Sequence, residues 1–350
     1  MKAKILELLR REDGYVSGQE LCTILNVSRT AVWKAVKSLE NEGYVIEAVR
    51  NKGYRLVENE SENFSKDIYS KSEIASRLRA ESGVKEVVFY DSIDSTNSEC
   101  ARRATEGVES GLLIVSDNQT NGKGRRGRSW TSPPGSNVYF SLMSRPDIRP
   151  EDAPMITLLM SLAVCMGMEK ISEGRIYKTS GRTRAEKRDA NAPMIKWPND
   201  IVIKGKKCCG MLTEMSCEAD YISYVVIGVG INVRHQNFPE EIAGTAISLE
   251  DAWEKKVPRS LLVAEIINEF GPLLKRFEEE KDLGFVRREY FDRLINAGRK
   301  VRVLDPKGEY DGIARGINET GELLVETSDG KVHEVNSGEV SVRGIYGYAL

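Results

Sequence analysis

The sequence predicts an α+β protein made of three units in a row. Helical periodicity followed by a basic hairpin indicates an N-terminal winged helix-turn-helix. Strands and helices in mixed order indicate a central α+β domain on a mixed sheet, and short alternating strands indicate a C-terminal β-barrel. A chain of 350 residues can hold two or three such domains. We place the boundaries at residues 1–62, 63–297 and 298–350.

The N-terminal unit begins with two amphipathic segments. Apolar residues recur at helical spacing from Ile5 to Leu9 and again from Leu21 to Val27. Ser28 is a good N-cap and begins a third helix with the same apolar spacing. Residues 44–49 and 54–57 are typical of the two strands of a hairpin. Together these elements predict a winged helix-turn-helix.

The cations of this unit gather on the third helix and on the hairpin tip, Arg50-Asn51-Lys52-Gly53. Residues 1–57 carry ten basic and seven acidic residues, a modest excess. The position of these cations suits a third helix that lies in the major groove of DNA, with phosphate contacts from the hairpin beside it. The alternative is a winged unit used only for protein contacts. The predicted DNA-binding residues are Ser28, Arg29, Thr30, Trp33, Lys34, Lys37 and Lys52.

A polar, non-periodic segment at residues 58–67 predicts a linker to the central unit. After it we expect a helix, a strand, a helix, two strands, a long apolar helix and two further strands. Residues 172–192, with six basic and three acidic side chains, predict an insertion loop at the surface. The expected elements span residues 68–82, 87–90, 95–105, 112–116, 138–143, 154–171, 201–203 and 225–231.

From residue 300 onward, short alternating strands separated by glycine-containing turns predict a small SH3-like β-barrel. Its strands are expected at residues 300–304, 310–318, 323–327, 332–335 and 339–343.

The composition narrows the class of protein. The 51 basic and 53 acidic residues nearly cancel, so a polyanion must be met by a local patch. The chain has no run of about eighteen apolar residues and no signal-peptide core, which predicts a cytoplasmic protein without a membrane partner. Six cysteines without a C-x-x-C pair predict reduced thiols. With only two histidines, chemistry is expected to depend on fixed positive charge.

The most distinctive segment is Gly122–Trp130, in which glycines alternate with four cations. Glycine allows close approach to a ligand, and arginine offers planar, multi-donor recognition of carboxylate and phosphate. The segment therefore predicts an anion-binding loop. Its spacing matches a dinucleotide fingerprint, but Ser132-Pro133-Pro134-Gly135 forbids the helix that such a site needs. Taken alone, the loop also fits a solvated basic run or a non-specific nucleic-acid patch.

Four other short segments hold polar residues at expected strand ends or turns. Each alone also fits a plain structural role: a helix cap, a proline turn or a solvated lysine. The segments are Asp94–Asn97, Gln119, Lys196–Asp200 with Lys207 and Gly210, and Gly228–Asn232.

As a set, in this order and spacing, the loop and these segments resemble the biotin protein ligase family, specifically its bifunctional members that are also biotin operon repressors. The resemblance covers nearly the whole chain and implies that the central unit is a ligase domain. The chain departs from the family pattern in two places. Lys123 stands where the family loop usually has arginine, and residues 172–192 are inserted before Lys196.

The resemblance implies a reaction in two halves. Biotin and ATP give biotinyl-5′-adenylate and pyrophosphate, and the adenylate then acylates one lysine of the biotin carboxyl carrier domain of a carboxylase. The biotin carboxylate is already ionised at neutral pH, so its attack on the α-phosphate needs no general base. It needs relief from the repulsion between two anions, which nearby cations supply.

The resemblance also implies residue roles. Arg125 and Lys207 would be catalytic, near the carboxylate and the α-phosphate. ATP would contact Arg128, Trp130, Lys196, Asn199, Asn232 and Arg343, and Mg²⁺ would be held by Asp200 and Asn199. Biotin would contact Ser95, Thr96, Asn97, Gln119, Lys123, Gly124, Arg125, Lys207, Gly210 and Gly228.

In the resembling proteins the adenylate favours a homodimer that binds operator DNA, whereas the monomer docks the carrier domain. A biotin-responsive repressor is therefore implied as well as a ligase. Two alternatives stay open. One is a non-catalytic, biotin-sensing transcription factor, which leaves the cationic loop unexplained. The other is a lipoate-type ligase, which is expected to lack the Gly-x-Gly-Arg-Arg-Gly loop.

Overall fold

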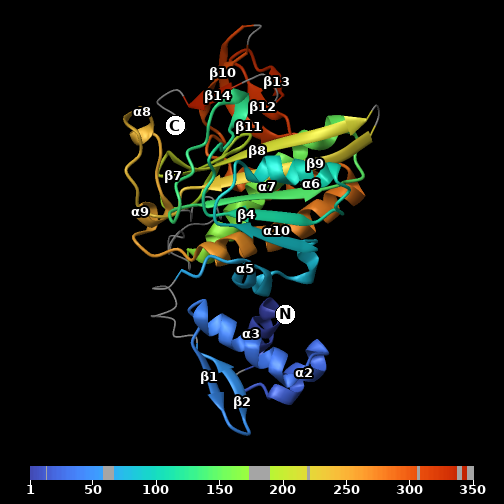
Figure 1. The fold of residues 1–350 in the computed structure, drawn as a ribbon. Coiled ribbons are helices and arrows are strands. Elements are labelled where there is room, and N and C mark those ends of the chain that lie inside the picture. The colour runs from blue at the N-terminus through green and yellow to red at the C-terminus, as the bar shows by residue number, and fades with distance from the viewer. Residues whose placement is uncertain are drawn as a thin grey trace.

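The computed structural model describes residues 1–12, 14–57, 67–172, 190–218, 221–305, 308–336 and 341–344, the last four by their backbone. The three units follow one another along the molecule, with the N-terminal helices and hairpin at the bottom and the C-terminal strands at the top (Figure 1). Most of the predicted linker and of the predicted insertion lies outside the described residues.

The N-terminal unit has three helices and a two-stranded hairpin, which confirms the predicted winged helix-turn-helix. The hydroxyls of Ser17 and Ser28 accept hydrogen bonds from the backbone three residues later and so begin the second and third helices. At the hairpin turn, Asn51 and Gly53 adopt positive φ angles of 65° and 117°. The elements are α1 (Lys2–Arg11), α2 (Gly18–Leu25), α3 (Arg29–Asn41), β1 (Ile46–Val49) and β2 (Gly53–Leu56).

A seven-stranded mixed sheet forms the central unit, in the order β3-β4-β5-β9-β8-β7-β6. β3 and β4 are parallel, and the other neighbouring pairs are antiparallel. Five of these strands lie where the sequence predicts them, whereas β6 and the long β8 were not predicted. The strands are β3 (Glu86–Tyr90), β4 (Leu112–Ser116), β5 (Val138–Ser144), β6 (Met194–Lys196), β7 (Asp200–Ile203), β8 (Lys206–Glu218) and β9 (Tyr221–Ile231).

Helices cover both faces of this sheet. α7 and α10 pack together, and a Cβ on Gly167 would lie only 2.7 Å from Ile266, so the glycine permits their close approach. α6 covers the opposite face, because its Cys100 packs with Leu112 and Ile114, which alternate with the β4 residues of the main core. The helices are α5 (Lys71–Arg77), α6 (Thr96–Thr105), α7 (Ala153–Ile171), α8 (Glu240–Ala243), α9 (Leu249–Trp253), α10 (Arg259–Glu280) and α11 (Arg287–Arg293).

Short 3₁₀ turns complete the central unit. The first replaces the end of the predicted helix at residues 68–82, since α5 already ends at Arg77. The turns are η1 (Ala80–Ser82), η2 (Arg125–Gly127), η3 (Pro150–Asp152) and η4 (Gly284–Val286).

Helix α7 is the most apolar element of the chain. By length and composition alone, the segment Pro150–Ile171 could cross a membrane. However, 72% of its most apolar 18-residue stretch is buried inside the fold. Its contacts with the sheet and with α10 are those of a core helix.

The C-terminal unit is a five-stranded antiparallel sheet in the order β13-β12-β11-β10-β14. Among the described residues β13 and β14 are its two edges, so the strands form an open sheet with no pairing that closes a barrel. Trp197 Nε1 donates a hydrogen bond to the carbonyl oxygen of Gly321 at 3.1 Å and joins this unit to the central one. The strands are β10 (Lys300–Leu304), β11 (Tyr310–Ile317), β12 (Leu323–Glu326), β13 (Val332–Val335) and β14 (Ser341–Gly344).

The N-terminal unit contacts the central unit mainly through α1 and α5. Arg10 Nη2 donates to both carboxylate oxygens of Glu73, at 2.8 and 2.7 Å. Tyr44 donates its hydroxyl proton to the same carboxylate at 2.6 Å. Because Glu73 is buried, these charge-assisted contacts fix the junction between the two units.

Candidate active site

One cavity of about 750 Å³ opens beside β8 and β9 in the central unit. This volume lies within the range of about 300–1,000 Å³ that is typical of small-ligand pockets. Every predicted cavity residue except Arg343 lines it; Arg343 is in β14, and its side chain lies outside the described residues. The residues brought together are Ser95, Thr96, Asn97, Gln119, Lys123, Gly124, Arg125, Arg128, Trp130, Lys196, Asn199, Asp200, Lys207, Gly210, Gly228 and Asn232.

The N-terminus of α6 forms a polar end of this cavity. Ser95 caps the helix, so its hydroxyl accepts from the backbone N–H of Ser98. Gln119 Oε1 accepts from Thr96 N at 2.9 Å, and the Gln119 amide nitrogen donates to Ser132 Oγ at 3.0 Å. These contacts hold the predicted biotin residues in fixed orientations at the end of a buried network.

Asn97 is the most constrained of these residues. Its Nδ2 donates to Glu214 at 2.7 Å, and its Oδ1 accepts from Ser141 Oγ at 2.6 Å. Ser141 is fully buried in β5 and also lies 2.7 Å from Thr96 Oγ1. Neither Ser141 nor Glu214 was predicted from the sequence.

Two glycines of β9 leave the room that the cavity needs. A Cβ on Gly228 would lie 2.0 Å from Asn97 Oδ1, and one on Gly230 would lie 2.6 Å from Trp130 Nε1. The Trp130 indole therefore lies directly over the strand, and Lys207 Nζ stands 5.4 Å from its ring centroid. Within the described residues the buried Trp130 Nε1 has no hydrogen-bond partner.

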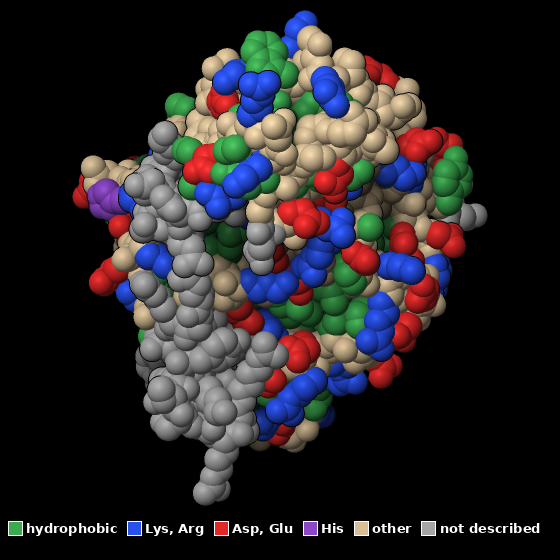
Figure 2. Space-filling model, turned by 90° about the horizontal axis from the view of Figure 1, so that it is seen from below, with side chains coloured by type: hydrophobic (Ala, Val, Ile, Leu, Met, Phe, Trp, Pro, Cys, Tyr) green, Lys and Arg blue, Asp and Glu red, His purple; other side chains and the backbone are tan. Residues whose placement is uncertain are grey.

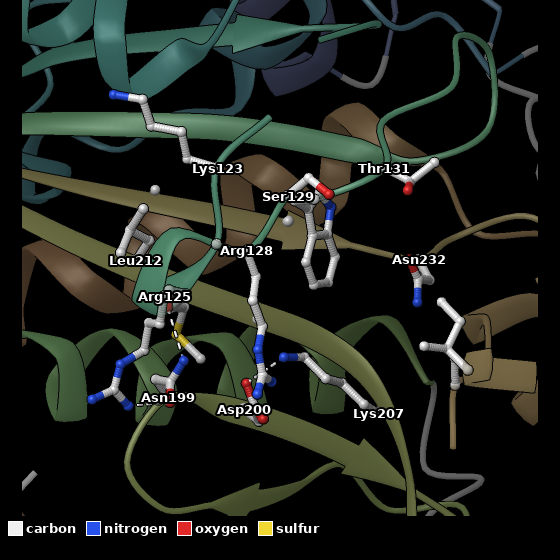
Figure 3. A pocket seen from close by; sticks show the side chains of 18 of the residues that line it. Lys123, Arg125, Arg128, Ser129, Thr131, Asn199, Asp200, Lys207, Leu212 and Asn232 are labelled. Atoms are coloured by element: carbon white, nitrogen blue, oxygen red, sulfur yellow. Dashed lines mark hydrogen bonds and ion pairs between the residues drawn. The ribbon is translucent and has the colours of Figure 1, made fainter. Parts of the chain in front are cut away.

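Arg125 contacts the turn between β6 and β7, and Lys207 contacts the first residue of β7. Arg125 Nη1 donates to Asn199 Oδ1 at 2.7 Å, and Lys207 Nζ lies 2.6 Å from Asp200 Oδ1. The side chain of Arg128 extends toward the same region (Figure 3). Burial lowers the pKa of Arg125, although the Asp200 charge opposes this shift. A guanidinium is effectively always protonated in proteins, so Arg125 acts as a cation at neutral pH.

The cationic loop folds back on itself above the sheet. Gly124 N donates to Arg128 O at 2.7 Å, and Trp130 N donates to Gly122 O at 2.8 Å. Between them Arg126 adopts a positive φ of 57°, a conformation that a non-glycine residue adopts at some cost. This path brings Arg125, Arg128 and Trp130 to one cavity, as predicted.

The C-terminal unit also reaches the cavity. Leu304 of β10 is among its lining residues, and the Trp197–Gly321 hydrogen bond holds the neighbouring turn against that unit. Lys196 lines the cavity although only 8% of it is exposed. Because its neighbour Trp197 is bonded to Gly321, the position of Lys196 depends on both the central and the C-terminal units.

The predicted DNA-binding side chains of α3 lie on an exposed surface. Arg29, Thr30, Lys34 and Lys37 are exposed, and Trp33 is 51% exposed although it is a large apolar side chain. Lys52 is exposed at the hairpin turn, with its Nζ 5.8 Å from the Tyr15 ring centroid. Seen from below, this end of the molecule mixes basic with acidic side chains rather than forming a uniform basic patch (Figure 2). Ser28 differs from the others, because its hydroxyl caps α3.

Sequence comparisons match each of the three units. The HTH domain model matches residues 2–55, the biotin/lipoate A/B protein ligase family model residues 89–232, and the biotin protein ligase C-terminal domain model residues 297–343. The chain is 35% identical over 347 residues to the bifunctional ligase/repressor BirA of Bacillus subtilis (strain 168), covering 98% of both proteins. The chain belongs to this family of ligase/repressors.

Other members of the family agree with this assignment. The bifunctional ligase/repressor BirA of Escherichia coli (strain K12) is 30% identical, covering 97% of this chain and 96% of that protein. The biotin protein ligase from Aquifex aeolicus, solved in complex with biotin and ATP, has a TM-score of 0.61 and 28% identity, covering 74% of this chain and 99% of that one. The family and fold predicted from the sequence are therefore confirmed.

Asp200 and Asn199 are the two residues predicted to hold Mg²⁺. Mg²⁺ binds through oxygen, with one or two carboxylates plus substrate phosphates and water. The Asp200 carboxylate and the Asn199 amide oxygen fit this chemistry and line the cavity, but each now contacts a cation. Within the described ranges, no group of three or more His, Cys, Asp or Glu side chains is placed to hold a metal. A bound ion would therefore depend on phosphate oxygens.

Proposed function

We propose that this chain activates biotin with ATP to biotinyl-5′-adenylate and then transfers biotin to a lysine of a carboxylase carrier domain. The observation that carries the proposal is the layout of one cavity. Its polar end offers hydrogen-bond donors and acceptors from Ser95, Thr96, Asn97 and Gln119, and its other side gathers the cations of the loop and of β8. This layout suits a ligand with a ureido ring at one end and a carboxylate at the other.

The first half-reaction follows from these cations. The biotin carboxylate attacks the α-phosphorus, a new C–O–P linkage forms, and pyrophosphate leaves with the bonding electron pair. Two unit charges 4 Å apart interact by about 4 kcal/mol at an effective dielectric near 20, so an unshielded approach of the anions is costly. Arg125 and Lys207, both lining the cavity, are proposed to offset this repulsion.

The remaining cavity residues are proposed to hold the nucleotide. Arg128 and Lys196 would address its phosphates, Asn232 its sugar or base, and Trp130 its adenine ring. Arg343 is proposed for the same ligand from the C-terminal unit. Mg²⁺ held by Asp200 and Asn199 would neutralise phosphate charge when bound.

The second half-reaction needs a nucleophile from another protein. An unprotonated lysine amine of the carrier domain attacks the acyl carbon, the amide bond forms, AMP leaves, and the amine proton passes to solvent. An acyl-adenylate is prone to hydrolysis, so a loop lying over the cavity serves this step by excluding water.

The winged unit supports a second proposed role, repression of biotin genes. The exposed cations of α3 and the hairpin suit an operator site. We propose that adenylate binding favours a homodimer that places two such units on a two-fold operator, and that the protein acts in the cytoplasm. This coupling requires the adenylate to bind monomer and dimer with different affinity.

The proposed ligase activity is tested by following pyrophosphate release with ATP and either biotin or lipoate. Release with biotin that exceeds release with lipoate is expected. No release with either acid, together with calorimetric binding of biotin, would favour the non-catalytic sensor. Faster release with lipoate would favour the lipoate-type ligase.

The proposed repressor role is tested by sedimentation and by DNA binding, each with and without biotin plus ATP. The weight-average mass and the affinity for a two-fold operator are both expected to rise with the two substrates. An unchanged mass and affinity would remove the switch.

A further inference from the structure

We propose that Glu214 fixes the hydrogen-bond polarity of the polar end of the cavity, so that this end selects a ligand ring presenting an N–H donor to Asn97. Glu214 is a positioning residue, because Asn97 lines the cavity and Glu214 does not. The inference rests on the proposed function, in which this end binds the ureido ring of biotin.

The Glu214 carboxylate decides how the Asn97 amide is oriented. Glu214 Oε2 lies 2.7 Å from one terminal atom of Asn97, and an ionised carboxylate only accepts hydrogen bonds. That terminal atom is therefore the donor Nδ2. The carbonyl oxygen of Leu212, a second pure acceptor, lies 3.3 Å from the same atom. Both neighbours require a donor, so the Asn97 oxygen must point the other way.

The oxygen that points the other way faces Ser141 and Gly228. Because Asn97 Oδ1 cannot donate, Ser141 must donate its hydroxyl proton across their 2.6 Å contact. A side chain on Gly228 would place its Cβ 2.0 Å from the same oxygen, so only glycine leaves this space open. A carbonyl oxygen has two lone pairs, and Ser141 uses one of them. The second is available to a ligand N–H, since both Asn97 and Gly228 line the cavity.

The other Glu214 oxygen faces the cationic loop. Glu214 Oε1 lies 3.7 Å from Lys123 Nζ, and both side chains are about two-fifths exposed. Such an exposed pair adds little stability by itself. The two oxygens of the Glu214 carboxylate therefore have different partners: Oε2 orients Asn97, and Oε1 contacts Lys123 of the loop. Removing Lys123 should therefore leave the orientation of Asn97 intact.

A ureido ring has two N–H donors and one carbonyl acceptor. An Asn97 oxygen held toward the cavity matches one of the donors, whereas an Asn97 nitrogen would oppose it. Glutamine at position 214 keeps the shape of the side chain, but its amide both donates and accepts. Only the longer 3.3 Å contact with the Leu212 carbonyl would then favour the present orientation, so Asn97 could present its nitrogen to the cavity in part of the molecules. The polar end would lose its preference for N–H donors without losing its shape.

The matched ligand is the cyclic carbonate analogue of biotin, in which two ring oxygens replace the two N–H groups. Sites built to bond an N–H reject the analogue that lacks it, because a buried polar group is left unpaired. The quantity that reports the role of Glu214 is thus the ratio of the two dissociation constants. It is insensitive to a general loss of affinity.

The test is calorimetric titration of the full chain with both ligands. We expect Glu214→Gln to weaken biotin binding by about 10- to 100-fold and to shrink the ratio between the ligands, as loss of a charge-assisted hydrogen bond implies. Glu214→Ala should shrink the ratio in the same way, whereas Glu218→Gln, at the exposed end of β8 and outside the cavity lining, should keep it. Thermal unfolding of each variant checks that it is folded. If the ratio is unchanged in both Glu214 variants, the role of Glu214 is wrong but the proposed function still stands. A wild-type chain that binds no biotin would overturn the proposed function and this inference with it.

Discussion

Lys207 Nζ lies 2.6 Å from Asp200 Oδ1 and 5.4 Å from the centroid of the Trp130 ring. One ammonium group is thus shared between a carboxylate and an aromatic face at the centre of the cavity. A phosphate entering the cavity has to compete with Asp200 for this charge. The Asp200 carboxylate therefore sets the strength with which Lys207 can bind a developing negative charge.

Replacing Lys207 with methionine removes the charge but keeps most of the side-chain stem. We expect the rate of biotin-dependent pyrophosphate release at saturating substrates to fall by about 10²–10³-fold, as for loss of one preorganised donor to transition-state charge. Lys207→Arg keeps the positive charge but not the compact shape of the ammonium group. Its rate should therefore lie between the rates of the wild type and of Lys207→Met. Lys204→Met is the control, because Lys204 is exposed and does not line the cavity. An undiminished rate in Lys207→Met would remove its catalytic role.

Gly228 and Gly230 are two residues apart on β9 but contact different side chains. An alanine at 228 would press on Asn97, and one at 230 would press on Trp130. Overpacking of this kind costs about 1–3 kcal/mol, or about 5- to 150-fold in affinity. We expect Gly228→Ala to weaken biotin binding and Gly230→Ala to weaken ATP binding, measured by separate titrations. Equal effects of both variants on both ligands would contradict the assignment of two subsites.

The cavity was predictable because many of its lining residues stand in short motifs. Glycine, lysine and asparagine at fixed spacing, as in Lys196–Asp200 and Gly228–Asn232, have a recognisable pattern before any fold is known. Their supporting partners have no such pattern. Asn97 of α6 packs on Gly228 of β9, so its partners Ser141 and Glu214 come from the two strands that flank β9, namely β5 and β8. A serine inside a largely apolar strand, such as Ser141 in Val138–Ser144, is nevertheless a signal, because a buried hydroxyl needs a partner.

The predicted elements were most accurate where the apolar signal is strong, either periodic as in α3 or continuous as in α7. β8 was missed because Lys206, Lys207 and the polar residues of its exposed end interrupt the alternation that marks a strand. β6 has only three residues, too few for any period to appear. The five C-terminal strands lie close to their predicted positions, and their pairing order involves distant segments, which local sequence does not encode.

Arg293 forms the most buried ion pair among those described. Its guanidinium is 1% exposed and donates to both oxygens of Glu169 at 2.9 Å, joining α11 to α7. Arg293→Met would leave Glu169 buried without this cation, so the free energy of unfolding is expected to fall by about 3–5 kcal/mol. Lys85→Met, which removes the exposed Lys85–Glu109 pair, should change it by no more than about 1 kcal/mol. Denaturant unfolding measures the free energy of unfolding of both variants, and equal losses would show that burial does not decide what these two ion pairs contribute.

The junction between the N-terminal and central units should depend on pH through Glu73. Burial opposes charge on this carboxylate, but Arg10 and Arg77 outweigh burial, and the pKa of Glu73 is lowered. A carboxylate with a lowered pKa stabilises the folded contact fully above its ordinary pKa of about 4.3 and loses that contribution as pH falls through the lowered value. We therefore expect hydrogen exchange in α1 to accelerate on acidification below about pH 4, before the core of the central sheet opens.

Glu73→Gln tests the same junction at neutral pH. It removes the charge that Arg10 and Arg77 share, and breaking one side of a buried pair costs about 3–5 kcal/mol. Because Glu73 lies at the junction with the N-terminal unit and does not line the cavity, pyrophosphate release should be unchanged while α1 exchanges faster. If the operator-bound dimer requires a fixed orientation of the two winged units, operator affinity should fall as well, since a loosened unit pays an ordering cost on binding. The control is Glu7→Gln, which removes an exposed pair with Lys4 on α1. Wild-type exchange of α1 in Glu73→Gln would show that other contacts hold the two units together.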